Sequence, residues 1–364
     1  MNTFAGNKKI YADLHNHTTA SDGDLSPEEL IRKMAALGIK VAGVTDHDTD
    51  KGLERALAEG KKRGIQVIPG IEISVRFKED FFTGTLHVLS YFHPELLGDS
   101  AFMQSLNATL SKGRGDDLVR ARVKEINKFF GPESKPESSS TLLARPASKN
   151  ESETEQKIEP EPEQKISTEE STVQTPLQKI STEEFAVQTP FLERLLTFEE
   201  VASYSNTVTR RHFALALTEK HGIDNPDIVN QIIGNDSPAY LPSGIDLDSL
   251  SQFVENISGF TKKSSLLMVL AHPAAGSFPG GGHYKEVHPP IEIVERLLPS
   301  FLSAGIRGLE INYPGHIEAH RKILRGWAEK HGLVVTGGSD CHDISVRPPG
   351  VEGITKEEFM MLEF

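Results

Sequence analysis

Two pairs of polar residues have both the spacing and the chemistry of metal ligands. His15 and His17 stand two apart at the end of a short apolar run, and Asp340 and His342 repeat this spacing near the other end of the chain. In an extended segment, side chains two residues apart point to the same side, so each pair can offer two donors to one ion. Imidazole and carboxylate donors together suit zinc, manganese or iron. The two pairs therefore predict a metal site.

Further acidic and histidine side chains follow or lie within other apolar runs. Glu72 is the most informative, since a carboxylate in the apolar stretch 70–73 needs a partner or a metal ion. Taken singly, His87 and His272 would more often be core histidines, but chance explains the whole set poorly. The predicted metal ligands are His15, His17, Asp22, His47, Glu72, His87, His272, Asp340 and His342. One ion cannot use nine ligands and Glu72 can bridge two ions, so we expect two or three divalent ions that make a hydroxide from bound water.

The elements that position these side chains alternate between strand and helix. Ser26 and Glu29 have the spacing of a capping box, and Gly64 is placed to end a helix. In β/α barrels the carboxyl ends of parallel strands meet on one face, which would gather the candidates there, although His87 lies near the start of its strand. Apolar runs predict strands at 10–14, 41–45, 67–73, 86–91, 266–271, 308–312 and 333–336. Helices between most of them, at 27–37, 52–63, 291–304 and 317–331, predict parallel strands with crossover connections.

The middle of the chain has a different composition. Segments 101–130 and 197–233 are predicted to be helical without strands, and between them residues 131–190 contain twelve Glu against six Lys or Arg. A 14-residue repeat lies there, and Pro176 and Pro190 recur in it and argue against a continuous helix. We expect a disordered acidic linker, or alternatively a peptide that binds an unknown partner. The predicted domains are 9–100 and 264–364, which form a barrel, and a helical insertion, 101–263, which the linker at 131–190 interrupts.

Composition excludes several classes of protein. Cys341 is the only cysteine, so an internal disulfide is excluded, and no apolar run approaches the roughly 18 residues of a membrane-spanning helix. No secretory signal is visible at the amino terminus, and a cytoplasmic location is expected. The net charge of −13 argues against a general nucleic-acid-binding surface but allows a small basic pocket.

The motifs, taken together, resemble a known family. They are Asp13-Leu14-His15-Asn16-His17, Ser21-Asp22-Gly23, Thr45-Asp46-His47-Asp48, Gly70-Ile71-Glu72, His87-Val88-Leu89, Ala271-His272-Pro273 and Gly338-Ser339-Asp340-Cys341-His342. This pattern resembles the polymerase and histidinol phosphatase (PHP) family of metal-dependent phosphoesterases. It is most similar to the branch of 3′,5′-nucleoside bisphosphate phosphatases and 5′-to-3′ exoribonucleases. The resemblance covers about residues 9–130 and 192–343.

The resemblance implies a fold, a reaction and roles for single residues. The fold would be α/β, a distorted seven-stranded, TIM-like β/α barrel with a helical insertion subdomain. The enzyme would hydrolyse a 3′,5′-bisphosphonucleotide, or the 5′ end of a short RNA, through a hydroxide that bridges metal ions. One ion would bind His15, His17, Glu72 and Asp340, a second Glu72, His87 and His272, and a third Asp22, His47 and His342. Glu72, Asp340 and His272 would form the catalytic centre, and Asp46 would orient a ligand imidazole.

The same resemblance places substrate-binding residues in the insertion. Arg210 and His212 match an Arg-Pro-His segment of the family, in which Arg211 replaces the proline, and Arg114 resembles another phosphate-contacting position. Arginine suits this role because its planar fork donates two hydrogen bonds to phosphate. Two alternatives stay open: a phosphatase of the histidinol phosphate type, and a metal-binding regulatory module without catalytic activity.

Overall fold

The computed structural model describes residues 9–134, 191–205, 207–258, 266–279 and 288–362. Its contacts divide the chain into two units, Met1–Ser134 with Pro190–Phe364, and Lys135–Thr189. Apart from residues 131–134, the predicted acidic linker at 131–190 and its repeat lie outside the described residues. Everything below concerns the first unit.

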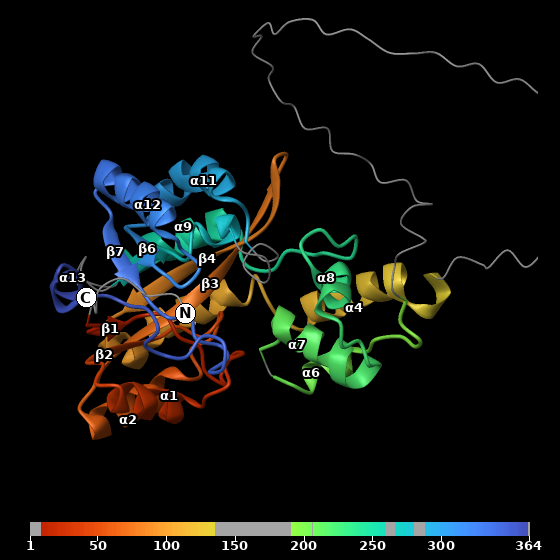
Figure 1. The fold of residues 1–364 in the computed structure, drawn as a ribbon, viewed down its shortest axis with the longest axis horizontal. Helices are drawn as coiled ribbons and strands as arrows, with labels where there is room; N and C mark the ends of the chain where they lie inside the picture. Colours follow the sequence, from red (N-terminus) through yellow and green to blue (C-terminus); the bar gives the residue numbers. More distant parts are fainter. Residues whose placement is uncertain (1–8, 135–190, 206, 259–265, 280–287, 363–364) are drawn as a thin grey trace, which may run out of the picture. The chain divides into compact units, whose positions relative to one another are not determined.

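Seven strands form one sheet in which spatial order follows chain order (Figure 1). They are β1 (Ala12–Asp13), β2 (Val41–Val44), β3 (Gln66–Glu79), β4 (Phe82–Phe92), β5 (Leu266–Leu270), β6 (Gly308–Asn312) and β7 (Val334–Gly337). Beyond β7 the chain returns to the first strand, where Leu14 N donates to Gly337 O (3.1 Å) and Asp340 N donates to His15 O (2.8 Å). The sheet is thus a nearly closed barrel, and the predicted seven-stranded α/β fold is confirmed.

The direction of β4 differs from the prediction. Strands β1 to β3 are parallel and so are β5 to β7, but β4 runs antiparallel to both of its neighbours. Only Asp80 and Phe81 separate β3 from β4, and a connection this short joins antiparallel strands, whereas a parallel crossover needs a dozen residues or more. The reversal places His87, in the middle of β4, opposite Ser74 and close to Glu72.

Helices outside the sheet follow from local sequence signals. They are α1 (Pro27–Ala36), α2 (Leu53–Arg63), α11 (Ile291–Ser303) and α12 (Glu318–His331). The capping box of Ser26 and Glu29 starts α1, and Gly64 ends α2 with a left-handed φ of 67°. The helices α3 (Ser100–Leu110) and α9 (Leu247–Ser258) contribute Phe102 and Phe253 to the same core. Short helices η1 (Pro94–Gly98), η4 (Ala275–Ser277) and α13 (Lys356–Met360) complete the barrel part.

A second, smaller hydrophobic core lies within the insertion. It is built by α4 (Asp116–Phe130), α6 (Phe198–Ala202), α7 (Arg210–Leu215), the π-helical turn η3 (Ala216–Lys220) and α8 (Pro226–Ile233), with η2 (Pro132–Ser134) after α4. Its two chain segments are joined directly, since Leu192 N donates to Phe130 O (2.7 Å). Of the predicted insertion 101–263, α3 and α9 therefore pack with the barrel, and the helices between them have their own core. No described helix is long and apolar enough to cross a membrane.

Candidate metal centre and the adjoining pocket

The structure brings all nine predicted metal ligands to one end of the barrel. His15 and His17 follow β1, His47 follows β2, His272 follows β5, and the loop after β7 contributes Asp340 and His342. Glu72 and His87 lie inside β3 and β4, and Asp22 lies in the loop before α1. His87 and His342 are partly exposed, and the other seven are buried. Their convergence was expected from strand ends, and for His87 it depends on the antiparallel direction of β4.

One group consists of His15, His17, Glu72 and Asp340. His17 Nε2 lies 3.0 Å from Glu72 Oε2 and 3.2 Å from Asp340 Oδ1, and His15 Nε2 lies 3.2 Å and 3.4 Å from the same two oxygens. Donors about 2.0–2.2 Å from a common ion at tetrahedral angles would be roughly 3.3–3.6 Å apart. The four atoms have nearly this spacing, slightly contracted.

The other oxygen of Glu72 faces a second set of imidazoles. His87 Nδ1 and His272 Nε2 each lie 3.0 Å from Glu72 Oε1, and 3.3 Å separates these two nitrogens. His47 Nδ1 lies 3.2 Å from Glu72 Oε2, and His47, Glu72 and His87 form a group of their own. The carboxylate of Glu72 is thus positioned to bridge two ions.

A third group joins Asp22, His47 and His342 with His17. Asp22 Oδ1 lies 3.3 Å from His342 Nε2 and 3.8 Å from His17 Nδ1, and the rings of His17 and His342 stack at 3.9 Å. The structure therefore adds His17 to the set that the resemblance implied. His17 contacts two groups, as Glu72 does.

Buried polar atoms without hydrogen-bond partners mark this centre. Within the described residues, this is true of His17 Nδ1, Asp22 Oδ1, His47 Nδ1, Glu72 Oε2, His272 Nδ1 and Asp340 Oδ1. Buried polar atoms are normally satisfied. All of these except His272 Nδ1, whose ring turns Nε2 to Glu72, face atoms of other candidate ligands without hydrogen-bond geometry. A cation among them would satisfy both nitrogens and oxygens, so the donor set fits divalent metal ions.

The electrostatics favour ionised carboxylates. Burial opposes ionisation of Glu72, but His47, His87 and His15 outweigh it and hold its pKa well below the usual range. For Asp340, Arg347 and His15 likewise outweigh burial and lower the pKa. Both candidate ligands are therefore negatively charged at neutral pH.

Three residues that the sequence analysis did not single out support the ligands. The Nδ1 of His15 donates to Glu310 Oε1 (3.0 Å), which directs Nε2 toward the centre, and Glu310 Oε2 accepts from His272 N (2.9 Å). Tyr313 Oη donates to Asp340 Oδ2 (2.9 Å), and Arg347 pairs with the same carboxylate. Glu310 lies in an apolar strand, so the argument used for Glu72 could have found it.

Asp46 has a different role from the one expected. Its carboxylate accepts from Thr18 N (2.7 Å), Thr18 Oγ1 (2.7 Å) and Ser21 Oγ (2.6 Å). The described contacts join it to no imidazole, so its expected role of orienting one was wrong. Asp46 instead shapes the loop that leads from His17 to Asp22.

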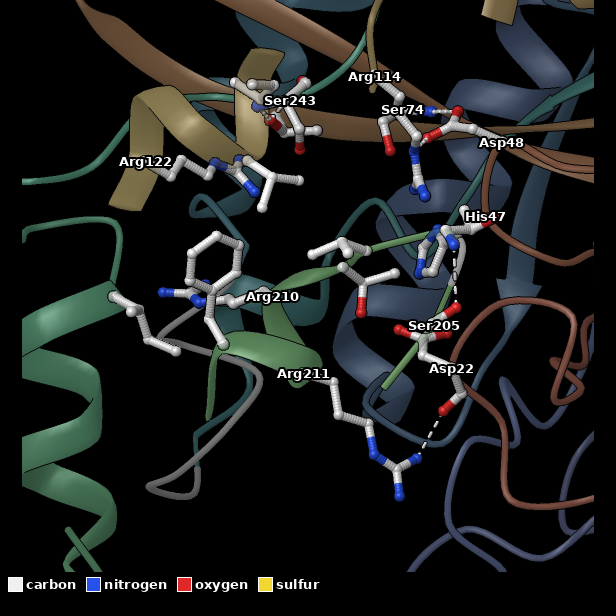
Figure 2. Close-up of a pocket in the computed structure, with 18 of the residues that line it drawn as sticks. Asp22, His47, Asp48, Ser74, Arg114, Arg122, Ser205, Arg210, Arg211 and Ser243 are labelled. Atoms are coloured by element: carbon white, nitrogen blue, oxygen red, sulfur yellow. Dashed lines mark hydrogen bonds and ion pairs between the residues drawn. The ribbon is translucent and has the colours of Figure 1, made fainter. Parts of the chain in front are cut away.

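A cavity of about 1290 Å³ adjoins the metal centre. Barrel residues including Asp22, Glu72 and Asp340 line one part of it, and residues of α4, α6, α7 and α8 line another. Five described arginines line it as well: Arg114, Arg122, Arg210 and Arg211 (Figure 2), and Arg347. The cavity thus combines candidate metal ligands with several arginines.

Arg114 is oriented by Asp48. The guanidinium pairs with Asp48 Oδ2, and Asp48 Oδ1 accepts from Ser74 N (2.7 Å). Among the described residues, the buried Nη1 of Arg114 has no hydrogen-bond partner. The backbone is strained at Asp48, which has a φ of 45°, and at His272 and Asp340, which also have positive φ. A positive φ costs a residue other than glycine about 1–3 kcal/mol, and such strain is found mostly at functional sites. Arg114 is therefore held with one donor available to an anion.

The other predicted substrate residues differ in their surroundings. Arg210 Nη1 donates to Asn235 Oδ1 (3.3 Å), and Arg122, which we did not predict, donates twice to Leu241 O (3.0 and 2.6 Å). Burial lowers the pKa of Arg122 to about 10, so it remains charged at neutral pH. His212 does not line the cavity; its Nδ1 accepts from Thr209 N (2.9 Å) in a capping box at the start of α7. Its contact with substrate stays a prediction.

Comparison with known proteins adds an independent line of support. Residues 13–146 match the PHP domain family. The chain is 36% identical over 136 residues to a 5′-3′ exoribonuclease of Haemophilus influenzae, a match that covers 35% of this chain and 46% of that protein. It is 36% identical over 110 residues to a 3′,5′-nucleoside bisphosphate phosphatase of Chromobacterium violaceum, covering 30% and 35%. The matches thus span less than half the length of these curated relatives.

Solved structures agree with the fold. A protein of Bifidobacterium adolescentis described as a metal-dependent phosphoesterase superposes with a TM-score of 0.59 at 18% identity, over 96% of this chain and 94% of that one. A Chromobacterium violaceum protein described as an amidohydrolase gives a TM-score of 0.58 at 19% identity, over 96% and 93%. The barrel and the gathered histidines and acids agree with the family match. Over residues 13–146 this chain is similar to the PHP domain family.

Proposed function

We propose that this protein is a metal-dependent hydrolase of phosphate esters of nucleotides. The observation that supports this most is the position of Glu72, whose two oxygens face separate sets of imidazoles. Bridged ions are a common device for activating water against phosphorus. The names of the relatives, an exoribonuclease and a nucleoside bisphosphate phosphatase, point to the same substrate class.

The donors of the chain divide among two or three divalent ions, for which Mn, Zn and Fe are the candidates. His15, His17, Glu72 and Asp340 would hold one ion, Glu72 with His87 and His272 a second, and Asp22, His47 and His342 a third. Bound ions would supply hydroxide near neutral pH and neutralise charge that develops on the phosphoryl oxygens.

Residues behind the ligands prepare the site for this chemistry. Glu310 keeps the proton of His15 on Nδ1, away from the centre, and Tyr313 with Arg347 holds one oxygen of Asp340 so that the other faces inward. Such outer contacts fix the orientation and raise the basicity of metal ligands. Glu72, Asp340 and His272 are the residues we place at the reacting phosphate.

The arginines indicate a substrate with more than one negative group. The cavity is lined by Arg114, Arg122 and Arg210. Of these, Arg114 pairs with the carboxylate of Asp48. The forked donors of these arginines suit a second phosphate or a nucleic-acid backbone. A 3′,5′-bisphosphonucleotide and the 5′ end of a short RNA both have this pattern, and both fit a chain whose overall charge is negative but whose insertion places several arginines in the cavity. His212 would act by fixing the start of the helix that bears Arg210.

A substrate panel tests the proposal. Purified protein loaded separately with Mn, Zn or Fe would be assayed on adenosine 3′,5′-bisphosphate, a short 5′-phosphorylated RNA and histidinol phosphate, with metal content measured alongside. We expect hydrolysis of the first or second substrate, and loss of both metal and activity in the His15→Ala/His17→Ala variant. Hydrolysis of histidinol phosphate alone would overturn the nucleotide assignment. Metal binding without hydrolysis of any substrate would favour a non-catalytic regulatory module.

A further inference from the structure

We propose that Arg211 is a positioning residue that connects the helical insertion to the metal group of Asp22 and His342. This inference rests on the proposed metal centre. Arg211 belongs to α7, whereas Asp22 and His342 belong to loops at the two ends of the barrel sequence. The residue therefore joins three segments that are distant in the chain.

The contacts of Arg211 are with the backbone of these ligands. Its Nη1 donates to Asp22 O (2.6 Å) and His342 O (3.3 Å), and its Nη2 donates to Asp24 Oδ1 (2.6 Å). Because the guanidinium binds the carbonyl of Asp22, the carboxylate of Asp22 remains available to a metal ion. The imidazole of His342 remains available for the same reason.

The two ligand loops are also tied to each other at this point. Asp24 N donates to His342 O (2.8 Å), the same oxygen that Arg211 reaches. Ser205 Oγ, also from the insertion, donates to Ser21 O (3.4 Å) in the loop of Asp22. Arg211 thus adds a charged donor to a junction where a displacement would move two ligands of one metal group together.

Neighbouring arginines of α7 serve opposite sides. Figure 2 shows Arg211 directed at Asp22, while Arg210 lies on the other side of the helix start, where it donates to Asn235 of the insertion. Rigid attachment at Arg211 therefore also determines how far Arg210 stands from the metal centre. An arginine suits this task because its planar fork donates in several fixed directions at once, which a lysine cannot do.

This arrangement couples metal binding to the order of the insertion. If an ion fixes Asp22 and His342, it also fixes the carbonyl oxygens that Arg211 binds, and the start of α7 is held more firmly. By thermodynamic reciprocity, firm docking of α7 raises the affinity of the same group for metal.

Metal titration of the full chain provides the first test. Stripped wild type, Arg211→Ala, Arg211→Lys and Asp24→Asn would be titrated with Mn, with affinities from calorimetry and bound metal from mass spectrometry. Changes behind metal ligands typically weaken metal affinity by about 10- to 100-fold, so we expect a loss of this size for the most weakly bound ion in Arg211→Ala. Arg211→Lys should lose less, and Asp24→Asn, which keeps the backbone contacts, should lose least. Arg55→Ala removes an exposed pair with Glu28 and is the matched control.

Hydrogen exchange of peptides from α7 provides a second readout. Added Mn should slow exchange there in wild type and in Arg55→Ala, and should have little effect in Arg211→Ala. Equal affinity and equal protection in wild type and Arg211→Ala would overturn the inference. If Arg211→Ala fails to fold, the metal affinities of Arg211→Lys and Asp24→Asn are compared instead. An unchanged affinity for the most weakly bound ion in both variants would count against the positioning role of Arg211. Wild type that binds no metal would instead refute the proposed metal centre.

Discussion

Glu310 illustrates how a residue outside the ligand set can govern the centre. It is fully buried, and its two oxygens accept hydrogen bonds from the ring of His15 and from the backbone N–H of His272. Its negative charge also affects the pKa of His15. Burial lowers this pKa, but the charges of Glu310, Glu72 and Asp340 outweigh burial and raise it well above its usual value. The residue therefore acts on two different ligands at once.

We predict that Glu310→Gln weakens metal binding while the fold is retained. The amide can still accept a hydrogen bond from His15, but it lacks the charge that makes the imidazole a stronger ligand. A loss of about 10- to 100-fold in metal affinity is expected, measured by titration of the stripped protein, with circular dichroism as the check on folding. Unchanged affinity would show that Glu310 serves only packing.

Asp48→Asn should impair substrates with a second charged group selectively. Asparagine tolerates the positive φ of this position, so the backbone can remain, but the charge that orients Arg114 is lost. A charged hydrogen bond contributes about 1.5–3 kcal/mol, and we expect KM for a bisphosphonucleotide to rise at least about 10-fold. KM for a nucleoside monophosphate should change much less. Equal changes for both substrates would contradict this role of Arg114.

His316 should make folding stability depend on pH. Its Nδ1 donates to Ile311 O (3.0 Å), and its Nε2 accepts from Ala274 N (3.1 Å) just after His272. Burial lowers the pKa of His316 to about 3, so the folded state keeps it neutral. As pH falls from about 6.5 toward 3, the unfolded chain takes up a proton that the folded chain refuses, and the free energy of unfolding falls.

Denaturant titrations between pH 7 and pH 4 would measure this effect. The fall in stability should be smaller in His316→Gln than in wild type, by an amount on the order of a few kcal/mol over the full range. His331→Gln, a change at an exposed histidine at the end of α12, is the control and should behave as wild type. An identical pH slope in His316→Gln and wild type would contradict the assignment.

At the scale of elements, the pairing of β1 with β2 depends on a close approach. Gly43 lies in β2, and a Cβ there would overlap the backbone of Leu14. Gly43→Ala should therefore destabilise the protein by more than about 2 kcal/mol, since overpacking of this kind typically costs 1–3 kcal/mol and backbone atoms yield least. Thermal unfolding would measure the loss.

A second glycine supplies the matched control. Gly326 lies in the interior of α12, is exposed, and has no atom within 4 Å of an added Cβ. Alanine is the better helix former by about 0.5–1 kcal/mol, so Gly326→Ala should raise the melting temperature. A similar loss of thermal stability in both variants would show that the effect of Gly43→Ala does not come from overlap with Leu14.

The elements also show how far the sequence could be interpreted. Strand and helix positions followed from apolar runs and caps, and nine candidate ligands followed from residue type at or near the predicted strands. The direction of β4 did not follow, because Gln66–Glu79 and Phe82–Phe92 extend well beyond the apolar cores that marked them. Contacts such as those of Glu310 and Arg211 join segments hundreds or scores of residues apart, and only the folded chain brings them together.

At the scale of the whole molecule, the contacts divide the chain at residues 134 and 190. Phe130 and Leu192, on either side of residues 135–189, share a backbone hydrogen bond, and Asn127 bonds to both N and O of Leu196 (2.8 Å each). Replacing residues 135–189 with a short Gly/Ser linker should therefore leave the metal content unchanged. The melting temperature should stay within a few degrees of that of the wild type. Loss of metal on deletion would show that this segment supports the centre.

The order of strands along the sheet has a consequence for biosynthesis. A chain that emerges from the ribosome can add each strand to the preceding one, from β1 through β6, without waiting for distant partners. The metal centre is different, because His15 and His17 must await Asp340 and His342, which follow more than 300 residues later. Nascent chains should therefore acquire their full set of ions only after residue 342 has emerged, and a ribosome stalled before residue 340 would display a nearly complete sheet with an open seam.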